Sequence, residues 1–468
     1  MTYHNEKLEE FNKYVIGKKI AIIGIGVSNI PLLDYFHNTN SYVSVFDNRE
    51  KENIDADILK KIEKYNMKGF FGKDNLNNLK NFDIIFRSPS AMPFIPEIEE
   101  EEKRGAIVTS EIEMLLKLTP SKVIGVTGSD GKTTTTSLIY HIMKQGGYKC
   151  FLGGNIGTPL FTEIKNMKPE DVVVLELSSF QLMNMQVSPM VSVVTNVTPN
   201  HLNVHRSYDE YIEAKKNIFM SQNEDGLVVL NYDNEITREF AKYVKGKKVF
   251  FSSKEKLEDG YIYDKEEELI KLCENGTRRH IISKKNIKLR GIHNYENICA
   301  ALAATSPFVD VDIQIKAIEK FTGVEHRLEF VREYHGAKWY NDSIGTSPTR
   351  TIAGLYAYDE NIILIAGGYD KHLDYEPIGK PIVDKVGTLI LMGATAVKIE
   401  EATKQALSKE GKVMPIYICD TLEQAVNLAR DKSKPGDVVL FSPASASFDL
   451  FKNFMERGEK FKELVKKL

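Results

Sequence analysis

The sequence is poor in cysteine and lacks any long hydrophobic run. The 468 residues include four cysteines, which lie far apart at Cys150, Cys273, Cys299 and Cys419. The sequence has no C-x-x-C pair, so a zinc knuckle is not expected. So few cysteines in so long a chain do not indicate a disulfide framework. No stretch approaches the roughly 20 apolar residues of a membrane span, and the N-terminus is polar, unlike a signal peptide. We therefore expect a cytoplasmic protein that is not embedded in a membrane.

Neither sign of charge is in excess. Lysine and arginine number 62 against 65 aspartates and glutamates, for a net charge of −3. This balance gives no drive toward nucleic acid or anionic membranes, so we expect small-molecule partners and neither nucleic acid nor membrane. Apolar residues make up 42% and charged residues 27%, as in a soluble globular protein. A chain of this length is too long to fold around one hydrophobic core, so two or three domains are expected.

The first segment begins with a strand, a glycine turn and a helix in "KKIAIIGIGVSNIPLLDYF", followed by a second strand that ends at Asp47. This order is a βαβ unit with an acidic residue about 20 positions after the glycines. Gly24 and Gly26 fit G-x-G, but the third glycine position holds Asn29. An incomplete fingerprint fits a nucleotide site or a plain tight turn, and it leaves a dinucleotide-dependent dehydrogenase open at this point.

The second segment contains "VTGSDGKTTTTS" at residues 126–137. The P-loop pattern G-x-x-x-x-G-K-[ST] would need glycine where Val126 stands. The physical arrangement is nevertheless suitable, because a strand end and a glycine loop lead into a helix whose first N–H groups attract anions. Lys132 can reach terminal phosphates, and the Thr133 hydroxyl can bind Mg²⁺. We predict a nucleotide site rather than a plain glycine loop.

Candidate metal ligands follow in the same segment. Glu176 ends the apolar strand "DVVVLELSS", where a buried carboxylate is costly unless it binds a metal or a partner. His201 follows the next apolar strand, and a structural histidine is the alternative there. Spacing alone does not distinguish Lys215 from Lys216. Residues 254–288 are polar and charged, and we expect a surface hairpin or excursion.

The third segment alternates strands such as "NIILIAGGYDK" and "DVVLFSPAS" with helical patterns. The continuous apolar strands favour parallel sheets covered on both faces. We predict an α/β protein of three domains in series. They are a Rossmann-like N-terminal domain at residues 1–119, a central P-loop-type ATP-binding domain at 120–325, and a Rossmann-like C-terminal domain at 326–468.

A series of motifs resembles the Mur ligase family of bacterial cell-wall synthesis along essentially the whole chain. In order they are T-G-S-D-G-K-T-T, E-L-S-S-F-Q-L, N-H-L-N with Y-x-x-A-K downstream, G-x-H-N-x-x-N, G-x-x-H-R and N-D-S. "GGNIG", "GGYDK" and "SPASASFDLFKNFMERGEKF" are similar to the D-glutamate-adding branch of that family. The resemblance implies a monomeric ligase of peptidoglycan precursor synthesis. ATP would phosphorylate the carboxylate of UDP-N-acetylmuramoyl-L-alanine, and D-glutamate would attack the acyl phosphate.

The resemblance also implies the site residues. ATP would be bound by Gly128, Ser129, Asp130, Gly131, Lys132, Thr133, Thr134, Asn294, Asn297, Arg327 and Asp342. Two Mg²⁺ ions would be held by Thr133, Glu176, His201 and a carbamylated Lys215, and the catalytic set would be Lys132, Glu176, His201 and Lys215. The UDP substrate would contact Val27, Ser28, Asp47, Asn48, Ser88 and Asn155, so that the first domain binds UDP rather than NAD. D-glutamate would contact Thr346, Lys371, Ser447 and Phe454.

The sequence departs from the family pattern at three places. Asn200 and Asn203 stand where D-H-x-D is usual around His201. Ile344 follows N-D-S where many relatives have lysine, and Gly345 and Ser347 differ from the commoner A-T-N ending. None of these changes alters the four catalytic candidates, so an active enzyme is expected.

Three other functions remain as alternatives. A sister ligase for another amino acid and a folylpolyglutamate-synthase-like enzyme share the central motifs. A nucleotide-gated regulatory protein without catalysis is favoured only by the missing aspartates, and ATP turnover distinguishes it from an enzyme.

Overall fold

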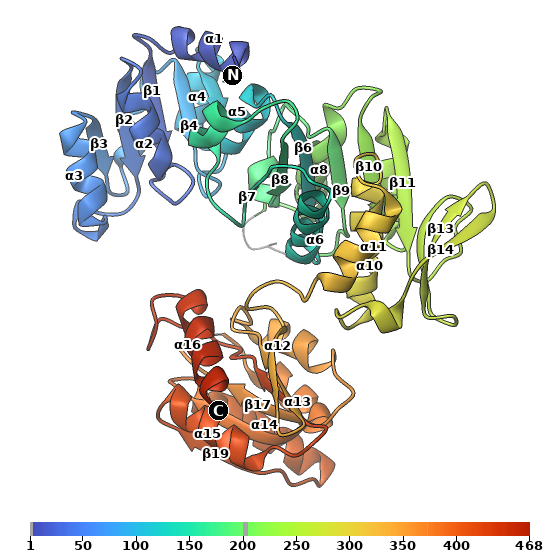
Figure 1. The fold of residues 1–468 in the computed structure, drawn as a ribbon. Helices are drawn as coiled ribbons and strands as arrows, with labels where there is room; N and C mark the ends of the chain where they lie inside the picture. The colour runs from blue at the N-terminus through green and yellow to red at the C-terminus, as the bar shows by residue number, and fades with distance from the viewer. Residues whose placement is uncertain (1–2, 200–204, 372) are drawn as a thin grey trace. The chain divides into compact units, whose positions relative to one another are not determined.

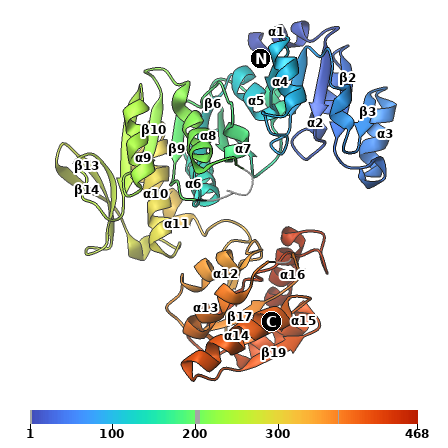
Figure 2. The same ribbon diagram turned by 180° about the vertical axis from the view of Figure 1, so that it is seen from behind.

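The computed structural model describes residues 3–199, 205–371 and 373–468. The chain divides into two compact units, shown in Figure 1 and from behind in Figure 2. The first unit comprises Met1–Ile287 and Ile292–Glu319, and the second comprises Lys288–Gly291 and Lys320–Leu468. Two sheets belong to the first unit and one sheet belongs to the second within the residues that are described. The predicted α/β class is confirmed, and each unit is considered separately below.

The N-terminal sheet is parallel and has the strand order β3-β2-β1-β4-β5. Its strands are β1 (Lys19–Ile23), β2 (Tyr42–Asp47), β3 (Lys68–Phe71), β4 (Ile84–Arg87) and β5 (Ile107–Thr109). The helices around it are α1 (Glu6–Tyr14), α2 (Ile30–His37), α3 (Ala56–Lys64), α4 (Pro96–Lys103) and α5 (Glu111–Leu118). The strand order reverses between β1 and β4. Ligands of open parallel sheets bind at such a switch point, so the turns after β1 and β4 form the candidate pocket.

The central sheet has the order β14-β13-β12-β11-β10-β9-β6-β8-β7. Its strands are β6 (Lys122–Thr127), β7 (Cys150–Gly154), β8 (Val172–Glu176), β9 (Val191–Val194), β10 (Leu227–Asn231), β11 (Lys247–Ser252), β12 (Gly260–Asp264), β13 (Leu269–Glu274) and β14 (Thr277–Ser283). The helices are α6 (Lys132–Gln145), α7 (Ser179–Leu182), α8 (Tyr208–Met220), α9 (Glu235–Phe240), α10 (Ile292–Thr305) and α11 (Val311–Lys320). Helices α6 and α10 pack side by side against this sheet in both views. Here the reversal lies at β6, between β8 and β9.

The polar stretch at residues 254–288 is more than a surface excursion. Strand β12 pairs parallel to β11, and β13 and β14 continue as an antiparallel hairpin. Apolar side chains scattered among the charges, including Ile262, Ile270 and Cys273, are buried there. The hairpin was predicted, but its continuation of the central sheet was not, because isolated apolar residues in a charged stretch give little periodicity.

The two sheets of the first unit share one apolar core. Phe161 begins the 3-10 helix η3 (Phe161–Asn166) of the central part of the chain and is almost fully buried. Its ring packs against Phe11, Tyr35 and Phe86 of the N-terminal part, with centroid distances of 6.3, 4.8 and 6.2 Å. Aromatic edge-to-face contacts of this kind add to the gain from burial. The two sheets therefore form one compact unit.

A buried carboxylate fixes the start of η3. Glu111, the first residue of α5, accepts hydrogen bonds at Oε1 from the N–H groups of Leu160 and Phe161, at 3.2 and 3.0 Å. Burial raises the pKa of Glu111 to about 7, although these two hydrogen bonds act in the opposite direction. The glutamate thus anchors the end of the loop that begins at Asn155.

We expect Glu111→Gln to become more stable relative to the native chain as the pH rises. An unfolded glutamate ionises near pH 4.5, whereas the folded carboxyl ionises near 7. The native chain therefore loses stability as the pH rises from 4.5 to about 7, and the loss stays constant above pH 7. Glutamine does not ionise and can still accept hydrogen bonds from both N–H groups. The relative stability should rise by about 1–3 kcal/mol between pH 5 and pH 8, as measured by urea unfolding. Glu100→Gln, on an exposed position of α4, is the control, and an equal difference at both pH values would contradict the prediction.

The second unit is an α/β layer with the order β15-β16-β20-β17-β18-β19. Its strands are β15 (Glu329–Tyr334), β16 (Ala337–Asn341), β17 (Ile362–Ala366), β18 (Val386–Met392), β19 (Ile416–Cys419) and β20 (Val438–Phe441). Its helices are α12 (Pro348–Leu355), α13 (Gly379–Lys385), α14 (Ala396–Glu410), α15 (Leu422–Lys432) and α16 (Phe454–Lys467). Alternate strand residues face two cores, with Leu364 and Leu440 in one and Ile363 and Val439 in the other. This explains the continuous apolar runs in the sequence.

Candidate functional site

The loop between β6 and α6 requires its two glycines. Gly128 has a φ of 150° and Gly131 a φ of 80°. A Cβ added at Gly128 would lie 1.9 Å from Thr195 Oγ1, and one at Gly131 would lie 2.4 Å from Asn297 Oδ1. Both the backbone conformation and the close neighbours therefore exclude a side chain. Val126 precedes this tight region and lies within β6, where a glycine is not needed.

Helix α6 begins at this loop without a side-chain cap. Gly131 is its N-cap residue, whereas Ser207 caps α8 and Ser110 caps α5 through their hydroxyl groups. The N–H groups of an uncapped first turn, together with the helix dipole, attract an anion. The loop shape is held from the other side, since Asp130 N–H donates to Asn196 Oδ1 at 2.9 Å and the Ser129 hydroxyl donates to Thr198 O at 2.9 Å. Thr133 and Thr134 follow in the first turn, and Thr134 is buried.

Two lysines converge on one carbonyl of the loop. Lys132 Nζ donates to Gly128 O and Ser129 O, at 2.8 Å each. Lys215 Nζ, from α8, donates to Gly128 O at 2.7 Å. Burial, reinforced by the charge of Lys132, lowers the pKa of Lys215 well below its usual value. The charge of Lys132 beside a phosphate-type loop is suited to a polyanionic ligand.

The structure separates Lys215 from its neighbour, which spacing did not. Lys215 is 1% exposed, and no carboxylate pairs with it among the described residues. Lys216 instead pairs with Glu213 at 2.6 Å and lies over the Tyr243 ring. Lys215 is therefore the lysine that reaches the loop.

Glu176 has a buried oxygen that could take a cation. It ends β8, opposite Val126 in the register with β6, and is 1% exposed. Its Oε1 accepts a hydrogen bond from Asn155 Nδ2 at 2.8 Å, whereas Oε2 has no hydrogen-bond partner among the described residues. A buried carboxylate oxygen without a donor fits a hard cation such as Mg²⁺. Glu176 and Thr133 could thus hold such an ion, and Asn155 orients the carboxylate.

Other predicted residues of the central part are placed as follows. His201, with Asn200 and Asn203, lies outside the described residues. Asn297 accepts a hydrogen bond from the Thr135 hydroxyl of α6 and donates to Asn294 Oδ1 at 3.3 Å, so the pair lies where α10 packs against α6. His205, which sequence reasoning did not select, is buried, and its Nε2 lies 2.9 Å from the Ser179 hydroxyl. Burial lowers the pKa of His205, although Glu210 acts in the opposite direction.

At the switch point of the N-terminal sheet, Asp47 binds backbone and arginine together. It accepts from the N–H of Ile25 at 2.9 Å, and Arg49 Nε and Nη2 each donate to it at 2.8 Å. Burial would raise the pKa of Asp47, but the hydrogen bonds from Arg49 and from backbone N–H groups outweigh it and lower that pKa. Arg49 was missed from the sequence. A cation two residues after a strand end, at a turn suspected of binding a nucleotide, was the available signal.

The remaining UDP candidates surround this pair. Val27 is 76% exposed, Ser28 is half-buried and Asn48 is exposed. Ser88, buried after β4, lies so close to Gly24 that a Cβ there would be 2.3 Å from its hydroxyl oxygen. The turns after β1, β2 and β4 thus bring the five predicted residues of this domain, Asp47 included, and Arg49 to one edge of the sheet.

In the second unit, a buried carboxylate follows β16. Asp342 accepts from the Ser442 hydroxyl at 2.6 Å and from Leu328 N–H at 3.2 Å, and burial raises its pKa to about 6. His326 and Leu328 both have positive φ, at 62° and 43°. Arg327 lies between them, so its backbone is held in an unusual turn that Asp342 helps to stabilise.

The D-glutamate candidates lie at the same end of this sheet. Thr346 is half-buried after Asp342, and Ser447 is buried after β20. Lys371 Nζ lies over the Phe448 ring, 5.2 Å from its centroid. Phe454 begins α16, and its carbonyl accepts from the Ser343 hydroxyl at 2.7 Å. The four residues therefore surround the turns that follow β16, β17 and β20.

Arg457 was not predicted and lies among these residues. It is 2% exposed, and its guanidinium donates to Ser343 O, Ser343 Oγ and Ala446 O at 2.8–3.1 Å. Burial lowers its pKa to about 10, although Asp449 and Asp342 act in the opposite direction. No carboxylate forms an ion pair with Arg457 in the described residues, so its buried positive charge lies among the D-glutamate candidates.

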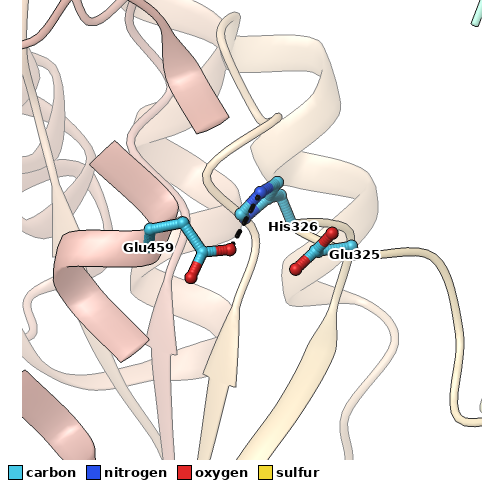
Figure 3. Close-up of side chains that lie close together, drawn as sticks. All are labelled: Glu325, His326 and Glu459. Carbon is cyan, nitrogen blue, oxygen red and sulfur yellow. Dashed lines mark ion pairs between the residues drawn. The ribbon is translucent and has the colours of Figure 1, made fainter. Parts of the chain in front are cut away.

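Glu325, His326 and Glu459 form a cluster with metal-like spacing, shown in Figure 3. Lys462 already supplies the cation, with Nζ 2.5 Å from Glu325 and 2.7 Å from Glu459. His326 Nε2 lies 3.7 Å from Glu459, the ion pair that is dashed in Figure 3. The cluster is therefore an ion-pair network that joins α16 to the segment before β15.

Comparisons with known proteins agree with this arrangement. The MurD-like N-terminal domain of Mur ligases matches residues 18–110, the Mur ligase middle domain matches 126–305, and the glutamate ligase domain of Mur ligases matches 326–445. A UDP-N-acetylmuramoylalanine--D-glutamate ligase of Acetivibrio thermocellus is 49% identical over 98% of this chain and 99% of its own length. The protein belongs to the Mur ligase family. A relative of the same name from Clostridium acetobutylicum is 47% identical over 98% of both chains.

Solved structures of Mur ligases share the fold. UDP-N-acetylmuramate-alanine ligase MurC from Thermotoga maritima aligns with a TM-score of 0.59 at 21% identity, covering 96% of this chain and 99% of its own. MurF from Acinetobacter baumannii aligns with a TM-score of 0.57 at 16% identity, covering 97% of this chain and 92% of its own. The prediction of three domains in series is confirmed. No helix in the described part of this Mur ligase is long and apolar enough to cross a membrane.

Proposed function

We propose that this Mur ligase joins D-glutamate to UDP-N-acetylmuramoyl-L-alanine at the expense of ATP, through an acyl phosphate, in peptidoglycan precursor synthesis. The observation that carries the proposal is the 47–49% identity, along nearly the full chain, to relatives named UDP-N-acetylmuramoylalanine--D-glutamate ligase. Because ATP and nucleotide-linked precursors are its substrates, we place the enzyme in the cytoplasm. We treat the chain as a monomer that needs neither nucleic acid nor a membrane.

We assign ATP to the central domain, residues 120–325. The uncapped first turn of α6 and the side chain of Lys132 would bind the phosphates, and Asn294 and Asn297 would lie on the adenine side. Thr133, Glu176, His201 and a carbamylated Lys215 would hold two Mg²⁺ ions, which would neutralise charge on the transferred phosphoryl group. The unpartnered Oε2 of Glu176 supports this metal assignment. Arg327 and Asp342 would complete the ATP set.

We assign UDP to residues 1–119 and the amino acid to residues 326–468. Arg49, fixed by Asp47, adds a cation to the UDP set of Val27, Ser28, Asp47, Asn48 and Ser88. Asn155 would contact the muramoyl part and orient Glu176. Lys371, Thr346, Ser447 and Phe454 would bind D-glutamate.

The chemistry then has two steps. The substrate carboxylate attacks the terminal phosphorus of ATP and releases ADP, giving an acyl phosphate. The uncharged amine of D-glutamate attacks the acyl carbon, and the tetrahedral intermediate loses a proton from nitrogen, expels phosphate and forms the amide. The protein contributes mainly position and electrostatic stabilisation.

Phosphate release by the purified protein tests this proposal. ATP, Mg²⁺ and UDP-N-acetylmuramoyl-L-alanine are supplied with D-glutamate, L-glutamate, L-alanine, L-lysine or no amino acid. We expect release with D-glutamate alone, and a product heavier by one glutamyl residue in mass spectrometry. Release with another amino acid would identify a sister ligase. If no phosphate is released in any of the reactions, a regulatory protein without catalysis would be favoured.

A further inference from the structure

The turn at residues 343–347 joins β16 to α12 beside the buried carboxylate of Asp342. It contains Thr346, one of the proposed D-glutamate contacts. Gly345 packs directly on Asp342, since a Cβ there would lie 2.8 Å from Oδ2. The turn is therefore held against the buried carboxylate of Asp342.

Two guanidinium groups bind consecutive carbonyls of this turn. Arg457, buried below it, donates to Ser343 O at 2.8 Å. Arg350, in the first turn of α12, donates through Nη1 to Ile344 O at 3.3 Å. Each guanidinium nitrogen of Arg457 donates to a protein oxygen, but Arg350 is exposed and makes no other hydrogen bond among the described residues. No described carboxylate forms an ion pair with Arg350.

The side chain at the turn itself is apolar. Ile344 offers no charge, so Arg350 is the exposed cation that reaches this position. Its charge is also felt at Asp342: burial raises the pKa of that carboxyl, and Arg327 and then Arg350 are among the smaller opposing influences. A planar guanidinium with unused donors matches the two oxygens of a carboxylate or a phosphate.

We infer that Arg350 binds an anionic group of a substrate beside Thr346, in the place that a lysine at position 344 would otherwise serve. Thr346 on the same turn favours a carboxylate of the acceptor amino acid over the phosphates of ATP. This inference rests on the proposed function. The competing role is a purely structural one, in which Arg350 only clips the turn through Ile344 O.

Steady-state kinetics of the full chain separate these roles. The variants are Arg350→Ala, Arg350→Ala with Ile344→Lys, and Arg430→Ala. Arg430 is the control because it is a partly exposed arginine on α15, paired with its neighbour Asp431 and remote in sequence from the turn. The KM values for D-glutamate, ATP and UDP-N-acetylmuramoyl-L-alanine are measured with kcat, and thermal unfolding is followed for each variant.

We expect Arg350→Ala to raise the KM for D-glutamate about tenfold to a hundredfold, as for a lost charge-assisted hydrogen bond, with kcat within about threefold. Adding Ile344→Lys should recover most of that loss. A rise in the KM for ATP instead would assign Arg350 to the phosphates and keep it as an anion contact.

Unchanged KM values, or a lower kcat and melting temperature alone, would overturn the inference in favour of the structural clip. If the double variant has the same KM for D-glutamate as Arg350→Ala, the claim that Arg350 takes the place of a lysine at position 344 would be overturned. If the native enzyme itself releases no phosphate with D-glutamate, the proposed function fails. That outcome differs from an active native enzyme and an Arg350→Ala variant with unchanged kinetics, which would overturn only this inference.

Discussion

Lys132→Ala is expected to lower the rate of D-glutamate-dependent phosphate release by about a thousandfold or more, in line with the loss of a cation that stabilises a transferring phosphoryl group. In the structure Lys132 Nζ rests on Gly128 O and Ser129 O, directly at the uncapped turn of α6. With ATP bound, we expect it to exchange these carbonyls for phosphate oxygens, whose negative charge grows in the transition state. The measurement is kcat and kcat/KM for ATP at saturating levels of the other two substrates.

The control lies on the same helix. Lys144 stands in the last turn of α6, over the Tyr140 ring, and Lys144→Ala should leave kcat within about twofold, as for a surface position away from the chemistry. Thermal unfolding distinguishes lost catalysis from a loosened loop, because Lys132 also crosslinks the loop carbonyls. Retention of a tenth or more of the native rate by Lys132→Ala would remove it from the catalytic set.

The sequence was sufficient for most of the fold because its strands are continuous apolar runs with glycine-rich turns. The helix expected after the loop is α6, and its apolar side chains Leu138, Ile139, Ile142 and Met143 are fully buried. The continuation of the central sheet through β12, β13 and β14 was not predicted. Strand pairing there depends on tertiary contacts with β11, which a charged local sequence does not reveal.

The candidate site divides in a similar way. The local sequence pointed to the loop and to Glu176 as candidates, whereas Lys215 was implied only by the resemblance to the Mur ligases. Arg49, Arg350 and Arg457 were missed, since each acts through a partner that only folding brings near: Asp47, Ile344 O and the Ser343 carbonyl. Residue spacing left Lys215 and Lys216 equivalent, and the structure gives the physical difference, because adjacent helical residues point about 100° apart and only Lys215 reaches the loop.

Lys215→Arg is expected to lower kcat by about a hundredfold to a thousandfold, as for the loss of a group that organises metal and phosphate charge. The native environment suits an uncharged amine, because Lys215 is buried beside Lys132, and burial together with that charge outweighs the opposing influence of Asp130. Such an amine can attack CO₂: the nitrogen–carbon bond forms, a proton leaves, and the lysine becomes a carbamate anion. That anion would supply a ligand oxygen to Mg²⁺, which an ammonium would repel.

The carbamate can be observed apart from the rate. Native protein in ¹³C-bicarbonate should show a carbamate carbonyl signal by NMR, and Lys215→Arg should not, because a guanidinium does not form this adduct. Lys216→Arg is the matched control: its side chain pairs with Glu213, so both the signal and the rate should persist. Removing CO₂ should reduce the native rate reversibly and leave Lys215→Arg unaffected. A native-like rate in Lys215→Arg would exclude the carbamate from the mechanism. Loss of rate without any native carbamate signal would instead make Lys215 a cation that binds phosphate alongside Lys132, and Glu176 would then need its remaining metal ligands from elsewhere.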